Sequence, residues 1–219
     1  GSFNRISFGD TPWNSVIRPS IAHGCAVWLP SSASSKQILE TWQYKSAKFI
    51  FSTNMNIPKS ALFVDLGWEP INDFLDRQRV SNFARFHDLD KNRLCRIIFD
   101  ELKGLTLHRG WGYPQYMKNV FNSVGLDHFY NSNVNLNIFK QFFGRFVRER
   151  EFQVIRNKSS LNAFSKFNLA SGRQPYLSNL LDFKSTRLKL LARTNCLPIN
   201  QVLYRRNMSE ITICQMCSC

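Results

Sequence analysis

The sequence predicts a mainly α-helical fold, an irregular bundle of several helices with few or no strands. Apolar residues recur at spacings of three and four along most of the chain, which is the period of an amphipathic helix. Alternating apolar and polar residues, the pattern of a half-buried strand, are nearly absent. With 219 residues, 43% of them hydrophobic and 20% charged, the chain can bury a core without disulfides or a metal.

Two stretches near the N-terminus carry the helical period. The Trp13–Trp28 segment is apolar on most sides, so we expect a buried helix that bends at Pro19. His23 lies within this segment, and core packing is the expected role of its side chain. Serines in the turn that follows should cap a helix over 36–51. The residues expected on its inner side are Ile38, Leu39, Trp42, Phe49 and Ile50, with Lys36, Lys45 and Lys48 outside.

Proline and glycine mark the ends of the next helices. Pro58 should open a short helix that Gly67 ends in the left-handed conformation. Asn72 or Asp73 should then cap a helix that runs to about residue 89. Further helices are expected over 93–102, 114–125, 135–155, 160–168, 185–195 and 198–205, with a helical turn at 175–181.

The 19 phenylalanines, five tryptophans and six tyrosines could fill a core or stack on nucleobases. Core packing is the more frequent role, and we assign to it the apolar face of the long helix over 135–155. That face consists of Phe139, Phe142, Phe143, Phe146 and Val147. Exposed stacking residues occur more often in loops, which makes Trp111, Tyr113 and Tyr116 the better candidates for base stacking.

Positive charge is in large excess and is unevenly distributed. The chain has 29 lysines and arginines against 15 aspartates and glutamates, a net charge of +14, and residues 139–219 hold 14 basic but only four acidic side chains. This segregation favours a polyanionic partner, RNA or DNA before an anionic membrane surface, over a merely solvated basic surface. The cations expected to bind the polyanion share helices with apolar stripes that face the other way: Lys140, Arg145, Arg148, Arg187, Lys189 and Arg193.

The residue patterns of the common enzyme classes are missing. A polymerase or a metal-dependent nuclease needs clustered carboxylates, and the nearest case, Asp88 with Asp90, fits a solvated helix end better. There is no Walker loop, no G-x-S-x-G and no H-E-x-x-H, and the four histidines are far apart in sequence. We therefore expect no catalytic residues, and no polymerase or nuclease activity, in this chain.

Cysteine usage indicates a reducing compartment and half of a metal site. Three of the six cysteines are scattered and three lie in the last six residues, and the N-terminus has no signal-peptide pattern. No apolar run is long enough to span a bilayer, so no membrane partner is expected. Cys214 and Cys217 have the C-x-x-C spacing that grips one Zn²⁺, and Cys219 could add a third of the four ligands of a structural site. A flexible thiol tail is the alternative.

Four segments with short sequence patterns cover nearly the whole chain. The Val16–Trp28 run resembles I-x-R-P-x-[IL]-x-Y-G-x-x-x-W, with His23 in place of the tyrosine. The Ile38–Ile50 run is similar to [LI]-x-x-x-Q-x-x-[AL]-x-[RK]-x-[IL], and Ser60–Ile71 looks like A-L-x-x-[EL]-L-G-x-x-P-[IL]. The Leu190–Asn200 run matches [LA]-R-[TS]-[GN]-x-L-x-[LI]-N. In this order and spacing, the segments resemble the part of LINE-like, non-long-terminal-repeat retrotransposon reverse transcriptases that follows the catalytic palm.

The resemblance implies a thumb-like helical region over 1–70, a basic helical linker over 71–205 and the start of a zinc knuckle over 206–219. In that family these parts guide template RNA and target DNA around the polymerase, in the nucleus. The fingers and palm, with their catalytic aspartates, would lie before Gly1, and the remaining zinc ligands after Cys219. The alternatives are a free-standing helical nucleic-acid-binding protein and a helical protein-interaction domain whose basic face is incidental.

We expect the C-terminal cysteines to bind Zn²⁺ only weakly. A structural site reaches apparent binding free energies of about 10–16 kcal/mol only with its full ligand set. The zinc content after dialysis against a mild chelator should therefore be well below one ion per chain. A tightly retained ion would mean instead that His108, His128 or Cys196 completes the site.

Overall fold

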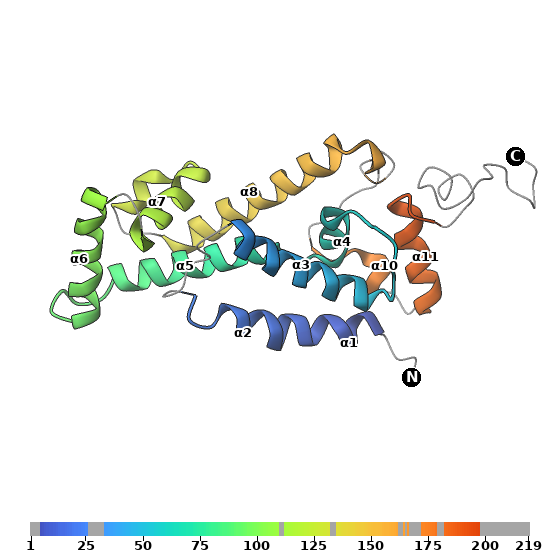
Figure 1. Cartoon of the computed structure of the whole chain (residues 1–219), viewed down its shortest axis with the longest axis horizontal. Coiled ribbons are helices and arrows are strands. Elements are labelled where there is room, and N and C mark those ends of the chain that lie inside the picture. Colours follow the sequence, from blue (N-terminus) through green and yellow to red (C-terminus); the bar gives the residue numbers. More distant parts are fainter. Residues whose placement is uncertain are drawn as a thin grey trace, which may run out of the picture. The chain divides into compact units, whose positions relative to one another are not determined.

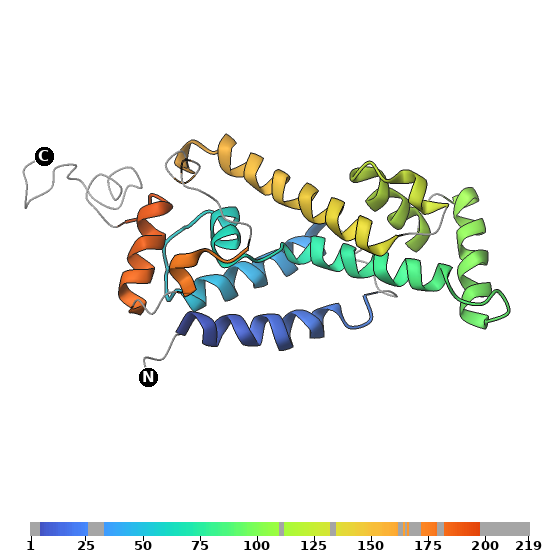
Figure 2. The same cartoon turned by 180° about the vertical axis from the view of Figure 1, so that it is seen from behind.

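The computed structural model describes residues 5–25, 33–109, 112–131, 135–161, 164, 166, 172–178 and 182–197 (Figures 1 and 2). Helices make up 77% of this part of the chain and it contains no strand, which confirms the predicted mainly α fold. Among the same residues, no helix combines the length and the apolar character needed to cross a membrane.

The chain divides into two compact units, each assembled from segments that are distant in sequence. Unit 1 comprises Gly1–Trp13, Gln43–Trp68 and Glu151–Cys219, and unit 2 comprises Asn14–Trp42 and Glu69–Arg150. The functional ranges expected from the sequence, 1–70, 71–205 and 206–219, are contiguous, and their roles remain predictions.

Unit 1 is built around the short helix α4 (Lys59–Leu66). This helix is apolar on nearly all sides, and Ala61 and Leu62 are fully buried. Pro58 precedes it and Gly67 ends it with φ 69°, as predicted. Other helices described in unit 1 are α1 (Arg5–Pro12), the second half of α3 (Ala33–Ile50), the end of α8 (Leu136–Asn157), η3 (Ser159–Leu161), α10 (Pro175–Ser178) and α11 (Phe183–Arg193).

An aromatic stack joins the N-terminal segment of unit 1 to the end of α4. The rings of Trp13 and Trp68 stack with their centroids 4.8 Å apart. The Trp68 indole N–H donates a 2.6 Å hydrogen bond to the carboxylate of Asp10, and the guanidinium of Arg173 lies 3.5 Å from the same carboxylate. Three segments far apart in the sequence are therefore held together at this point.

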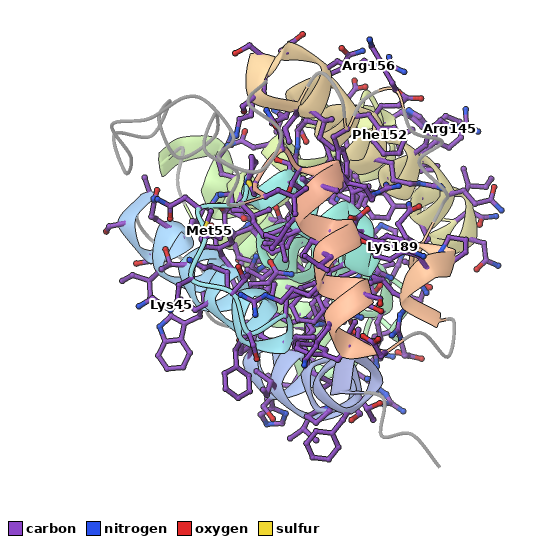
Figure 3. All side chains as sticks on the ribbon, turned by 90° about the vertical axis from the view of Figure 1, so that its right-hand side faces the viewer. Lys45, Met55, Arg145, Phe152, Arg156 and Lys189 are labelled. Atoms are coloured by element: carbon purple, nitrogen blue, oxygen red, sulfur yellow. The ribbon has the colours of Figure 1, made fainter. Side chains whose placement is uncertain are left out.

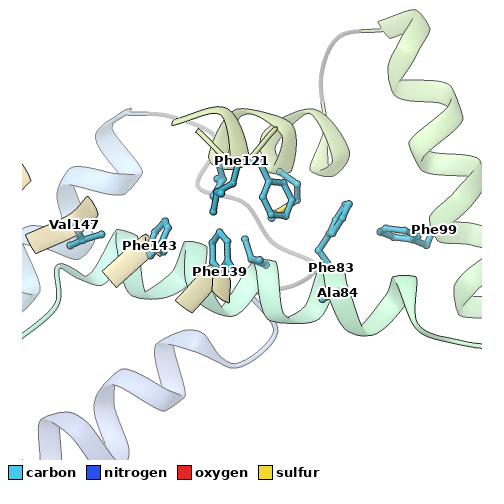
Figure 4. Packing of buried hydrophobic residues seen from close by; sticks show 11 residues of the cluster. Phe83, Ala84, Phe99, Phe121, Phe139, Phe143 and Val147 are labelled. Carbon is cyan, nitrogen blue, oxygen red and sulfur yellow. The ribbon is translucent and has the colours of Figure 1, made fainter. Parts of the chain in front are cut away.

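Unit 2 packs its helices around α5 (Ile71–His87). The ring of Phe83 meets those of Phe99 and Phe121 edge-on, with centroids 5.1 and 5.5 Å away. Phe139 of α8 lies edge-on to Phe121, at 5.7 Å (Figure 4). Other helices described in unit 2 are most of η1 (Trp13–Ile17), α2 (Arg18–Ala22), the first half of α3, α6 (Leu94–Arg109), α7 (Tyr113–Ser123), η2 (Asp127–Tyr130) and the first part of α8.

Most of the expected helices are confirmed, although the one predicted over 93–102 is α6, which continues to Arg109. The helix predicted over 135–155 is α8, and the one over 185–195 is α11. The helix predicted over 114–125 is α7, and Gly125 follows it with φ 70°. The predicted helix over 198–205 and most of the one over 160–168 lie outside the described residues.

The expectation of a buried helix over Trp13–Trp28 is wrong. The described part of this segment forms η1 and α2, in which Val16 is 60% exposed and no α2 side chain is buried. His23 is exposed rather than packed in the core. Only part of the segment is packed: Trp13 and Cys25 are buried, and the Arg18 guanidinium lies 4.1 Å from the ring centroid of Phe74. Its last three residues lie outside the described part of the chain.

The inner side of α3 is only partly the predicted one, because Ile50 is buried as expected but three of the other predicted inner residues are exposed. Trp42 is 67% exposed and Phe49 73% exposed, together with Ile38 at 57%. The side of α3 that is buried faces α1, which comes so close that a Cβ at Gly9 of α1 would lie within 2.6 Å of the Ile50 side chain. A close approach of α1 needs a side of α3 without large rings. The buried side chains of α3 are Gln43, Ala47 and Ile50.

The predicted side-chain cap of α5 is replaced by longer-range contacts. Pro70 occupies the N-cap position, and no side chain caps the helix there. The Asn72 amide instead donates to the Lys36 carbonyl over 3.2 Å, and the Asp73 carboxylate accepts from Arg150 at 3.0 Å. Both side chains therefore tie α5 to other helices of unit 2.

We expect Gly67→Ala to destabilise the protein far more than Gly125→Ala. Both glycines have φ near 70°, so either alanine costs about 1–2 kcal/mol in the left-handed region. A methyl group at Gly67 would also overlap the backbone of Gly172 and Arg173, whereas no described atom lies within 4 Å of one at Gly125. Urea unfolding of the two variants measures the difference, and equal losses of unfolding free energy would contradict the close approach at Gly67.

Candidate nucleic-acid interface

The outward side of α8 combines cations with an exposed aromatic ring. Phe139 and Phe143 pack into the core of unit 2, so the helical period turns residues 142 and 145 outward. Phe142 is 46% exposed, which shows that its assignment to the core was wrong. The Arg145 guanidinium lies 5.6 Å from the centroid of this ring, and Lys140 is exposed as well. In Figure 3 the Arg145 side chain extends away from the ribbon.

Two further arginines of α8 have different surroundings. Arg148 is exposed, and its Nε donates to the Gly144 carbonyl one turn earlier, at 3.1 Å. Arg150 is bound by the carboxylate of Asp73, which neutralises most of its charge. We define the α8 basic face as Lys140, Phe142, Arg145 and Arg148, all of which belong to unit 2.

The α8 basic face has the chemistry of a nucleic-acid contact. Ammonium and guanidinium groups bind backbone phosphates whatever the base sequence. An exposed aromatic ring can stack on an unpaired base, and a neighbouring arginine adds a cation that holds the strand. The face contains no paired carboxylates, so the arrangement suits binding rather than metal-assisted bond cleavage.

The three predicted cations of α11 are in three different environments. Lys189 is exposed, Arg187 is half-buried, and the side chain of Arg193 is only 14% exposed. The expectation that Arg193 faces solvent is therefore wrong. Of the three predicted cations, Lys189 is the one that is fully exposed.

Arg193 is instead part of a buried polar cluster in unit 1. Its guanidinium lies 3.1 Å from the carboxylate of Asp65, and the Tyr176 hydroxyl donates to the same carboxylate over 2.6 Å. The guanidinium also lies over the Phe164 and Tyr176 rings, 5.0 and 5.3 Å from their centroids. The cluster fastens α10 and α11 to α4. The sequence feature that could have indicated it is Asp65, because a lone acid in an apolar helix needs a partner when it is buried.

Burial dominates the electrostatics of this cluster. Desolvation raises the pKa of Asp65 to about 6, although the Arg193 charge and the Tyr176 hydroxyl act in the opposite direction. The same burial raises the pKa of the Tyr176 hydroxyl well above its usual range, with the Asp65 charge adding to the effect. The tyrosine therefore stays protonated and remains the hydrogen-bond donor.

The tyrosines proposed for base stacking serve a buried network in unit 2. The Tyr116 hydroxyl donates to the Asp76 carboxylate over 2.6 Å, and the Tyr113 hydroxyl donates to the Arg79 carbonyl at 3.0 Å. Arg79 itself is fully buried, and it donates to Asp76 at 2.7 Å and to the Cys25 carbonyl at 3.1 Å. Both tyrosines are at most half-exposed, so neither is an open stacking platform. Trp111 lies outside the described residues.

The described residues contain no group of three or more metal-ligating side chains. Asp88 and Asp90 are exposed just after α5, where Asp90 accepts a 2.8 Å hydrogen bond from the backbone N–H of Asn92. This is the solvated helix end that the sequence predicts. The predicted zinc ligands Cys214, Cys217 and Cys219 lie outside the described part.

Unit 1 also has an open cleft of about 510 Å³ at the end of α8. Lys158 is the one cation among its lining residues, which include no carboxylate, so the cleft is electrostatically suited to an anion. Tyr44 on its wall is held by a 2.7 Å hydrogen bond from its hydroxyl to the Ile57 carbonyl. The other lining residues are Asn56, Pro58, Asn157, Ser159 and Ser160.

No protein-family model, curated protein or solved structure matches this chain.

We expect the free energy of unfolding to fall between about pH 4 and pH 6 because of Asp65. Its pKa is about 6 in the folded chain and near 3.8 when unfolded, so the folded state binds the proton more tightly. The stabilisation that the protonated Asp65 contributes is complete below the unfolded pKa and is lost as pH rises through 6. The resulting fall in the free energy of unfolding is roughly 3 kcal/mol. Asp65→Asn, which keeps the shape and a hydrogen-bond acceptor, should flatten this part of the profile.

The control for this prediction is Asp182→Asn at the N-cap of α11. Asp182 is exposed, and the hydrogen bond from the Ser185 N–H lowers its pKa, so its linkage has the opposite sign. Asparagine caps a helix as well as aspartate, so the helix start is preserved. Unfolding curves measured across pH compare the two variants, and a slope unchanged by Asp65→Asn would contradict the assignment.

Proposed function

We propose that this chain binds RNA or DNA as the thumb and linker part of a LINE-like retrotransposon reverse transcriptase, without a polymerase active site of its own. The observation that carries the proposal is the α8 basic face, where the Arg145 guanidinium lies beside the exposed Phe142 ring and Lys140 and Arg148 are exposed on the same helix. The net charge of +14 adds long-range attraction for a polyanion. The order of the four sequence patterns supports the parentage.

In this role the α8 basic face holds a strand by its phosphates, and Phe142 stacks on a base where the strand is unpaired. Such contacts position a template or a target without reading its sequence, which suits a polymerase that must move along any template. The parentage also implies a nuclear location and a complete zinc knuckle formed with residues that follow Cys219. Chemistry on the nucleic acid belongs to the palm of the parent enzyme.

Two alternative functions, a free-standing nucleic-acid-binding protein and a protein-interaction domain, predict different observations. A free-standing nucleic-acid-binding protein has no palm motif, intact or decayed, in frame upstream in the genomic sequence. A protein-interaction domain retains nucleic acid weakly and without salt dependence, and the exposed apolar side chains of Trp42, Phe49 and Leu94 favour this second candidate.

We expect the chain to bind nucleic acid with little sequence preference and with a steep salt dependence. If six phosphates of a duplex are contacted, the logarithm of the association constant falls with that of the salt concentration at a slope of about −5. The triple variant Lys140→Gln, Arg145→Gln, Arg148→Gln should lower the magnitude of this slope by about 2–3, since each phosphate contact contributes roughly 0.9. Fluorescence anisotropy across a salt series measures both slopes.

The matched control removes three exposed charges of unit 2 from other helices and turns. Arg85→Gln, Lys91→Gln and Lys118→Gln change the net charge equally but should leave most of the slope intact. Phe142→Leu keeps an apolar side chain and should weaken single-stranded binding by about tenfold while changing duplex binding little, because stacking needs an unpaired base. Equal effects of the two triple variants would reject the α8 basic face, and a flat salt titration would reject the proposed function.

A further inference from the structure

Helix α6 of unit 2 exposes a continuous apolar side. Leu94 is 69% exposed, Ile97 46% and Ile98 49%, and Leu102 one turn later is 47% exposed. A rotation of 100° per residue places these four side chains on one side of the helix. A contiguous apolar side of this kind is a mark of an interaction surface rather than of an ordinary solvated helix.

The opposite side of α6 is held firmly within unit 2, so the apolar side keeps its orientation there. Phe99 is buried, with its ring centroid 5.1 Å from that of Phe83 and 5.9 Å from that of Phe86. The Lys103 ammonium donates to the Tyr130 carbonyl over 2.7 Å. Arg96 and Asp100 form a 2.7 Å ion pair along the same helix.

We propose that the apolar side of α6 pairs with the same side of a second copy of this chain, with the two helices antiparallel. Two exposed charges on this surface favour the antiparallel pair: Glu101 lies among the apolar residues and Arg93 lies just before the helix. A parallel pair brings Glu101 against itself, and like charges there oppose association. An antiparallel pair crossing near Ile97 brings Glu101 beside Arg93 of the partner subunit, twice by symmetry.

Two further features agree with a two-fold antiparallel contact. Such an interface uses the same patch on both subunits and therefore needs no second surface. Opposed helices also place the positive end of each macrodipole beside the negative end of the other. This side is apolar and carries the acid Glu101, so it is distinct in chemistry from the α8 basic face and does not depend on the proposed function.

The contact is expected to be weak. One helix per subunit contributes an interface at the low end of known sizes, which corresponds to micromolar or weaker dissociation constants. Sedimentation equilibrium over a wide range of protein concentration should therefore show a reversible monomer–dimer equilibrium. A chain that remains monomeric up to its solubility limit would overturn the proposal and leave the α6 side to a different protein partner.

Variants of the apolar side test where the contact lies. Ile98→Glu places an unpaired carboxylate near the centre of the contact and should raise the dimer dissociation constant by about 100-fold or more. Val16→Glu is the matched control, since Val16 is 60% exposed in the same unit but lies on η1. Equal effects of the two substitutions, or none from Ile98→Glu, would overturn the assignment to α6.

A charge exchange tests the antiparallel geometry. Glu101→Arg and Arg93→Glu should each weaken the dimer, by about three- to tenfold, because each places like charges side by side. The double variant exchanges the two charges and should restore most of the wild-type association. Failure of the double variant to recover, with both single variants weakened, would reject the antiparallel pairing.

Discussion

The burial of one side of α8 is the constraint on which the candidate interface depends. Phe139 and Phe143 are held in the core of unit 2 by the edge-on contact of Phe139 with Phe121 and by the stacked rings of the pair. Because each residue of a helix is turned by 100° from the last, this burial leaves no freedom for Phe142 and Arg145, which must face outward. The packing of the core thereby sets the spacing of the cations that would meet a nucleic acid.

The net charge of the chain overstates the surface available to a polyanion. Arg79, Arg150 and Arg193 are each bound to a carboxylate, and two of them are largely or fully buried. These pairs hold helices together and carry little field into solvent, because each buried cation is neutralised at close range. The proposed binding surface is therefore a small set of exposed cations on α8, with Lys189 on α11, rather than the whole basic half of the sequence.

Unit 2 presents two faces of different chemistry. The α8 basic face is cationic with one aromatic ring, whereas the outer side of α6 is apolar with the acid Glu101 among its residues. Electrostatics favours a polyanion at the first rather than at the second. The proposed nucleic-acid binding and the proposed self-association can therefore be tested separately, by substitutions that change one face and leave the other intact.

The sequence by itself determined that the chain is helical and where some of its helices end, as at Gly67 and Gly125. Pro58 and Gly67 acted locally, through a fixed φ and a left-handed residue, so no distant partner was needed to predict them. Which side of a helix is buried was decided by the tertiary structure, as at Trp42, because the helical period is compatible with several orientations and the close contact of Gly9 with α3 selected one. The role of Arg193 was likewise undetermined, since its partner lies 128 residues earlier in the chain.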